Sequence, residues 1–173
     1  MTGLARHTLR MLAREGYSVP DVLARLNTAI LDEGPRSRFI TLLYGELAPR
    51  ADGGMRVCIA SAGHPLPVKL TRAGAICDAA EPQPLLGVMD DLVFEEQVFD
   101  LDPGDVLVCV TDGVTERREG DRLLGDGNGL QELVATCTGL TAGAVGTRIQ
   151  KAVIDFATKP PRDDMAILVL RAL

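Results

Sequence analysis

The stretch that decides the fold is GDVLVCVTDGVTERREG, residues 104–120. Its apolar run Val106–Val110 follows a Pro-Gly-Asp sequence and ends at Thr111, Asp112 and Gly113. Such a run predicts a short strand that is apolar on both faces and covered by other layers. Asp112 then lies at the rim of a core, where its carboxylate needs a hydrogen-bonded turn, a basic side chain or a metal ion as partner. Because Asp-Gly is also common turn chemistry, a simple turn is the alternative.

A second pair of carboxylates, Asp163 and Asp164, stands directly before the apolar run MAILVL, residues 165–170. Adjacent carboxylates repel each other, and keeping both ionised beside an apolar core is costly without a cation. If the two apolar strands are antiparallel neighbours, Asp112 at the end of one lies beside Asp163 at the start of the other. Oxygen ligands without His or Cys suit Mg²⁺ or Mn²⁺. The alternative is a polar strand entrance in which Arg162 neutralises part of the charge.

The composition favours a soluble, globular protein, since 46% of the 173 residues are hydrophobic and 24% are charged. The net charge of -6 and the absence of any basic run longer than Arg117-Arg118 argue against a nucleic-acid partner. Apolar stretches are far shorter than the roughly 20 residues of a membrane helix. The N-terminus MTGLARHTLR lacks the apolar core of a signal peptide. We therefore expect a cytoplasmic protein without a membrane partner.

The cysteines, Cys58, Cys77, Cys109 and Cys137, are widely spaced and form no Cys-x-x-Cys motif, so a zinc site has little support. None is followed six residues later by Arg, as a phosphate-cradling cysteine nucleophile requires. Cys58 and Cys109 lie inside apolar runs, which indicates buried thiols.

Helical periodicity marks both ends of the chain. Residues 2–15 predict one helix, ended by Gly16, and a second helix begins after Ser18, which forms a capping-box pattern with Asp21. FITLLYGEL and MRVCIASA, joined through Asp-Gly-Gly, predict a hairpin, and GDRLLGDGNGL predicts a glycine-rich turn. Further strands are expected at 67–70, 94–101, 106–111 and 165–170, and helices near 130–138 and 141–157.

This order of elements predicts an α+β fold in which antiparallel sheet is covered by helices. We expect a single domain over residues 1–173. It comprises a helix pair at 1–33, followed by sheet and C-terminal helices over 39–173.

Several segments together resemble the SpoIIE-type branch of the metal-dependent PPM (type 2C-like) protein serine/threonine phosphatases. They are SAGHPLPVKL, PLLGV, PGDVLVCVTDGVTERRE and RDDMAILVLR, and DVLARLNTAIL and FITLLYGEL fit the same family. The resemblance spans residues 4–171. Val110 stands where the family often has Tyr, and Ala166 where it often has Thr. The resemblance implies a sandwich of antiparallel β-sheets flanked by helices.

The resemblance also implies a reaction in which a metal-activated water hydrolyses phosphoserine, without a protein nucleophile. Asp112 matches the metal ligand of the family's Thr-Asp-Gly motif, and Asp163 the first residue of its terminal Asp pair. The expected cofactors are two Mn²⁺ or Mg²⁺ ions. Gly113 would allow the backbone to approach an ion closely, and Asp164 would orient a metal-bound water. His64 is a candidate general acid or, alternatively, a residue that fixes its loop by hydrogen bonding.

The other metal-binding aspartates of the family lie on strands before the part that residues 1–16 resemble. We therefore expect a chain that lacks the family's first strands, an incomplete metal site, and an open sheet edge that favours a homodimer. The implied substrate is a phosphorylated regulatory protein of the anti-sigma-factor-antagonist type. The alternative is a catalytically weak or inactive phosphatase-fold binding module, or a fragment of a longer signalling protein.

Overall fold

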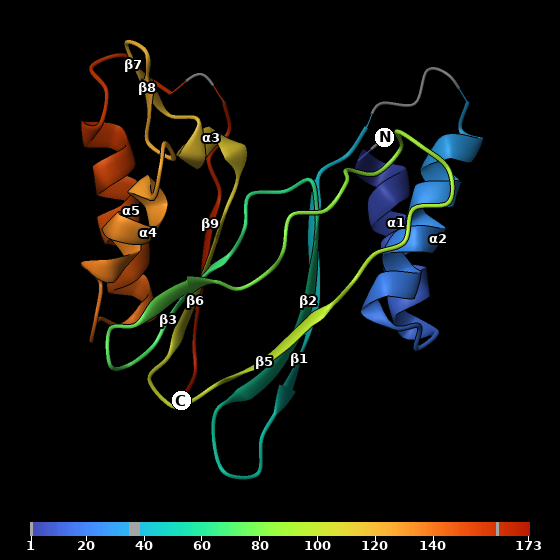
Figure 1. Ribbon diagram of the computed structural model, residues 1–173, viewed down its shortest axis with the longest axis horizontal. Helices are drawn as coiled ribbons and strands as arrows, with labels where there is room; N and C mark the ends of the chain where they lie inside the picture. Colours follow the sequence, from blue (N-terminus) through green and yellow to red (C-terminus); the bar gives the residue numbers. More distant parts are fainter. Residues whose placement is uncertain (1, 35–38, 162) are drawn as a thin grey trace. The chain divides into compact units, whose positions relative to one another are not determined.

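The computed structural model of the chain describes residues 2–34, 39–161 and 163–173 (Figure 1). The chain divides into two compact units. The first comprises Met1–Leu47, Val57–His64 and Ala80–Val98, and the second comprises Ala48–Arg56, Pro65–Ala79 and Phe99–Leu173. A single domain over residues 1–173 stays a prediction.

The predicted helix pair is confirmed in the first unit. Helices α1 (Thr2–Arg14) and α2 (Val19–Asp32), blue in Figure 1, pack against each other. The hydroxyl of Ser18 accepts the backbone N–H of Asp21 at 3.3 Å and donates to the Asp21 carboxylate at 2.7 Å, as the capping pattern predicts. The apolar face of α2 packs in a core with residues of the neighbouring strand and loop, namely Ala60, Ala62, Leu86 and Phe94.

Strands β1 (Leu42–Pro49), β2 (Met55–Ala62) and β5 (Gln97–Leu101) form a three-stranded sheet in the order β1-β2-β5. The predicted hairpin is β1 and β2, and its turn is closed by the backbone hydrogen bond from the N–H of Arg50 to the carbonyl of Gly54, at 3.2 Å. The change from helical to strand periodicity after residue 39 is thus reproduced by the structure.

The second unit is built on a four-stranded antiparallel sheet in the order β4-β3-β6-β9. Its strands are β3 (Val68–Leu70), β4 (Ile76–Asp78), β6 (Val106–Val110) and β9 (Ile167–Arg171). Helices α4 (Gly129–Ala135) and α5 (Ala142–Asp155), orange in Figure 1, pack against this sheet.

Strand β6 is buried on both faces, as its apolar run predicts. Val106, Val108 and Val110 point into the core shared with α4 and α5. Leu107, whose side chain points to the opposite face, is also buried. Strand β6 is therefore an interior strand of the sheet, paired with β3 on one side and with β9 on the other.

Some short elements were not predicted. The residues after β6 form a single-turn helix, α3 (Asp112–Thr115). Strand β7 (Arg118–Glu119), just before the expected glycine-rich turn, pairs with β8 (Arg122–Leu123) inside it to form a hairpin. This hairpin returns to α3, because the N–H of Gly125 donates to the carbonyl of Thr115 at 2.8 Å. Within the described ranges, no helix has the length and apolar character needed to cross a bilayer.

The open edge of β9 yields a prediction about self-association. Among the described residues β9 pairs with β6 alone, and Leu168 in β9 is 57% exposed. An apolar edge strand can pair with a second chain. We expect the purified chain to self-associate, and Leu168→Lys to raise the dissociation constant about tenfold, or ~1.4 kcal/mol, in sedimentation velocity.

Ile154→Lys is the matched control, because Ile154 is 50% exposed but lies on helix α5. If both variants weaken self-association equally, general surface apolarity is responsible and the edge of β9 is not.

Candidate active site

The register of β6 against β9 brings the Thr-Asp-Gly and Asp-Asp sequences together. Val110 pairs with Ile167, so the residues after β6 lie beside those before β9. Thr111 continues the pairing beyond the strands. Its N–H donates to the carbonyl of Ala166 at 3.1 Å, and its Oγ1 accepts the N–H of Ala166 at 2.9 Å. The same hydroxyl donates to the carbonyl of Asp164 at 3.2 Å. The predicted antiparallel neighbourhood of the two strands is confirmed.

Gly113 lies directly against the backbone of the Asp pair. A Cβ atom at this position would overlap the carbonyl oxygen of Asp164 and lie 3.4 Å from that of Asp163. Only glycine leaves room for this approach. The close contact in the structure is with protein backbone, and an approach of Gly113 to an ion stays a prediction.

The carboxylates of Asp112, Asp163 and Asp164 are exposed. Oδ1 of Asp112 accepts the N–H of Gly113 at 2.8 Å. None of the three carboxylates forms an ion pair with another residue that the structure describes. Arg162, the alternative source of neutralisation, lies outside the described residues, so that alternative stays open.

The chemistry of these carboxylates suits a divalent cation, and their role as metal ligands stays a prediction. Exposed carboxylate oxygens suit the hard cations Mg²⁺ and Mn²⁺, which also keep water ligands. In residues 2–34, 39–161 and 163–173, however, no group of three or more His, Cys, Asp or Glu side chains is placed to hold a metal ion.

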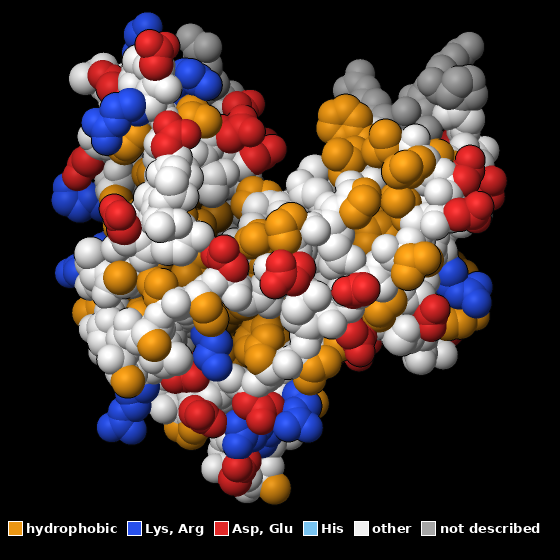
Figure 2. Space-filling model, in the orientation of Figure 1, with side chains coloured by type: hydrophobic (Ala, Val, Ile, Leu, Met, Phe, Trp, Pro, Cys, Tyr) orange, Lys and Arg blue, Asp and Glu red, His pale blue; other side chains and the backbone are white. Residues whose placement is uncertain are grey.

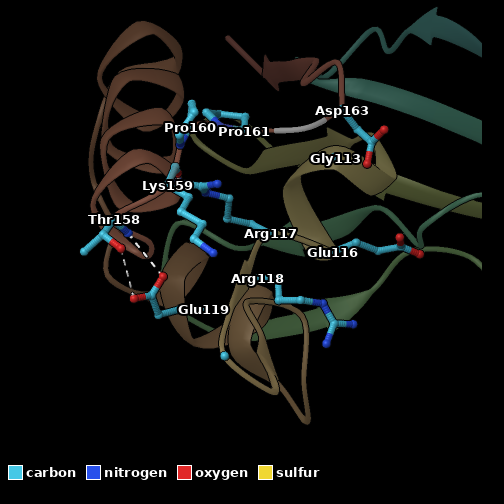
Figure 3. Close-up of a pocket in the computed structure, with 11 residues that line it drawn as sticks. Gly113, Glu116, Arg117, Arg118, Glu119, Thr158, Lys159, Pro160, Pro161 and Asp163 are labelled. Atoms are coloured by element: carbon cyan, nitrogen blue, oxygen red, sulfur yellow. Dashed lines mark hydrogen bonds between the residues drawn. The ribbon is translucent and has the colours of Figure 1, made fainter.

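A cleft of about 470 Å³ opens beside the two motifs (Figure 3). Asp163 and Gly113 lie at one end of it, and Arg118, Glu119 and Lys159 lie further along. Side chains of both charge signs are intermingled over the region of β7, β8 and α5 (Figure 2). The cleft volume is within the range of small-ligand sites.

Arg117, on the wall of this cleft, is buried with 6% of its surface exposed. Its Nε donates to the carbonyl of Val153 at 3.0 Å, and its Nη2 donates to that of Ala157 at 2.9 Å and to that of Lys159. The sequence indicated only a pair of basic residues. No local pattern predicts this burial, because the partners are backbone carbonyls far along the chain.

Two other candidate residues have modest roles in the structure. Burial raises the pKa of the half-buried Cys109 to about 11, so this residue is a neutral thiol at physiological pH and a poor nucleophile. His64 follows β2 in the first unit, and its carbonyl accepts the hydroxyl of Ser61 at 2.9 Å. A general-acid role for His64 stays a prediction.

Comparison with known proteins defines the class to which this arrangement belongs. The family model described as "Stage II sporulation protein E (SpoIIE)" matches residues 1–173, and the chain therefore belongs to the SpoIIE family. A search of curated proteins found no match.

Solved structures of phosphatase domains share the fold. The RsbU and RsbW domains of Rv1364c from Mycobacterium tuberculosis align with a TM-score of 0.77 at 23% identity, over 97% of this chain and 46% of that one. The PP2C phosphatase domain and regulatory fragment of SpoIIE from Bacillus subtilis gives 0.73 at 15% identity, over 97% and 48%. The SiaA-PP2C domain of Pseudomonas aeruginosa gives 0.79 at 15% identity, over 98% and 68%.

These alignments confirm the predicted α+β, PPM-phosphatase-like fold. The chain spans less than half the length of the first two solved chains.

The tight packing of Gly113 yields a second prediction. In Gly113→Ala the new Cβ must displace the backbone of Asp163–Asp164, so we expect a loss of about 1–3 kcal/mol of unfolding free energy in urea titrations. Gly146→Ala in α5 is the control, because its Cβ would meet Val169 at an ordinary 3.8 Å. A helical alanine there should be neutral or stabilise by about 0.5–1 kcal/mol. Equal effects at both positions would contradict the packing argument.

Proposed function

We propose that this chain forms part of a metal-dependent phosphoprotein phosphatase that hydrolyses phosphoserine on a small regulatory protein of the anti-sigma-factor-antagonist type. One observation carries the proposal. The Thr-Asp-Gly motif after β6 and the Asp-Asp motif before β9 pack against each other, with Thr111 bound to Asp164 and Ala166. Membership in the SpoIIE family and the fold shared with SpoIIE and RsbU phosphatase domains support this assignment.

The proposed cofactors are two Mn²⁺ or Mg²⁺ ions. Among structures of this fold, one is of RsbX in complex with magnesium and another is of the SpoIIE phosphatase domain presoaked with Mn. In our proposal Asp112 and Asp163 are ligands, and Asp164 orients a water by hydrogen bonding. Such ions, when bound, supply an activated water and offset the charge of the phosphate.

The protein side chains around the site favour attack by water. The hydroxyl of Thr111 donates to the carbonyl of Asp164, and that of Thr115 donates to the carbonyl of Asp112. Cys109 is held as a neutral thiol by its raised pKa. Both threonine hydroxyls of the Thr-Asp-Gly region are therefore engaged as hydrogen-bond donors. In our proposal the role of the chain is to hold the carboxylates in place, and no protein nucleophile is needed.

The carboxylates provide the central test of the proposal. In a protein that also carries the family's first strands, we expect Asp112→Asn and Asp163→Asn each to lower metal-dependent phosphate release from a phosphoserine protein about a thousandfold, or roughly 4 kcal/mol in the barrier. Asp155→Asn is the control, because Asp155 is an exposed carboxylate of α5 that forms an ion pair with Lys151 on the same helix. Turnover that persists in chelator or in either site variant would exclude the metal mechanism.

The partial ligand set predicts weak activity of residues 1–173 alone. With few carboxylates available, Mg²⁺ exchanges its waters reluctantly for protein ligands. We expect this chain to hydrolyse phosphoserine peptides barely above background. An extension that carries the family's first strands should raise the rate by about a thousandfold or more. Robust metal-dependent turnover by the chain alone would contradict this prediction, and no gain on extension would favour the alternative, a binding module.

A further inference from the structure

Arg117 is unusual among the charged residues of the second unit because its buried guanidinium has only backbone partners among the described residues. Its acceptors are the carbonyls of Val153, Ala157 and Lys159. Burying a guanidinium is costly unless its N–H donors are satisfied. Each acceptor must therefore stay where the planar guanidinium can reach it.

These acceptors lie at the end of α5 and just beyond it. Val153 is in the last turn of the helix, where carbonyls have no partner within the helix, and Ala157 and Lys159 follow the helix end. A second contact holds the same segment. The Glu119 carboxylate accepts the backbone N–H of Thr158 at 3.2 Å and the Thr158 hydroxyl at 3.3 Å. Figure 3 shows the Glu119 contact and the side chain of Arg117 beside Lys159.

The segment that these contacts hold ends four positions before the candidate metal ligand Asp163. Pro160 and Pro161 follow Lys159, and proline fixes φ near -65°, which restricts the backbone at these two positions. On the other side of the Asp pair, Thr111 holds Asp164 and Ala166. The backbone is therefore held on both sides of Asp163, by Arg117 before it and by Thr111 after it.

We propose that Arg117 is a positioning residue that sets the place of Asp163 relative to Asp112 and so determines the affinity of the site for a divalent cation. This inference rests on the proposed function, because it takes both aspartates as metal ligands. Arg117 touches neither carboxylate. It acts through the backbone of Lys159 and the two prolines that follow it.

The test compares Mn²⁺ binding by variants of the full 173-residue chain. Paramagnetic broadening of backbone amide NMR signals at Asp112 and Asp163 gives the midpoint of a Mn²⁺ titration without any need for turnover. We expect Arg117→Ala to raise this midpoint about 10- to 100-fold, the usual effect of losing a residue that orients a ligand. Arg117→Lys should give a smaller increase than Arg117→Ala. The ammonium group keeps part of the donor set, but it cannot reproduce the planar fork of the guanidinium.

Arg148→Ala is the matched control. Arg148 is an exposed arginine of α5 whose Nη1 also donates to a backbone carbonyl, that of Thr136 at 2.6 Å, but this carbonyl does not lead to the Asp pair. We expect its Mn²⁺ midpoint to equal that of the wild type. Thermal melts without metal separate a general loss of stability from a loss of affinity.

The outcomes are distinct. If Arg117→Ala and Arg117→Lys bind Mn²⁺ as the wild type does, or if Arg148→Ala weakens binding equally, the positioning role is overturned. If Arg117→Ala does not fold, Arg117→Lys decides by the same criterion. If Mn²⁺ broadens neither Asp112 nor Asp163 in the wild type, this inference is overturned, whereas the proposed function is tested separately by the activity of the Asp112→Asn and Asp163→Asn variants.

Discussion

The pairing of β6 with β9 is the interaction on which the candidate site depends. Thr111 and Asp164 are 53 positions apart in the chain, and only the antiparallel ladder brings them within hydrogen-bonding distance. A slip of one residue in this ladder would turn each side chain of β9 to the opposite face. Thr111 would then meet neither the carbonyl of Asp164 nor the N–H of Ala166. The geometry of the site is therefore set by strand register.

The register is in turn set by apolar burial. Val106, Val108 and Val110 point into one core, and fully burying each such side chain contributes about 1.5–3 kcal/mol. Leu107 is buried on the other face, so neither face of β6 can be exchanged for a solvent-facing one. The position of a polar motif that directly follows such a strand is therefore fixed by the burial of the strand. This explains why the apolar run and the motif after it could be interpreted together.

The apolar run of β6 and the motif after it could be predicted from the sequence because both are local patterns. The apolar strands, the turn residues and the cap at Ser18 are each encoded within a few positions of the chain. Helix α3 was missed because a single turn has no periodicity, and the strands of the β7–β8 hairpin are too short to show alternation. The burial of Arg117 was missed for a different reason. Its partners are carbonyl oxygens, which every residue carries, so no residue type at Val153 or Lys159 signals the contact.

The contacts that position the Asp pair are made to its backbone. Thr111 binds the carbonyl of Asp164, Gly113 packs against the same backbone, and Arg117 holds the carbonyl of Lys159. Positioning through the backbone leaves the side-chain oxygens of Asp163 and Asp164 open to other ligands. Binding of a cation by these oxygens would therefore leave intact the backbone contacts that fix the place of the motif.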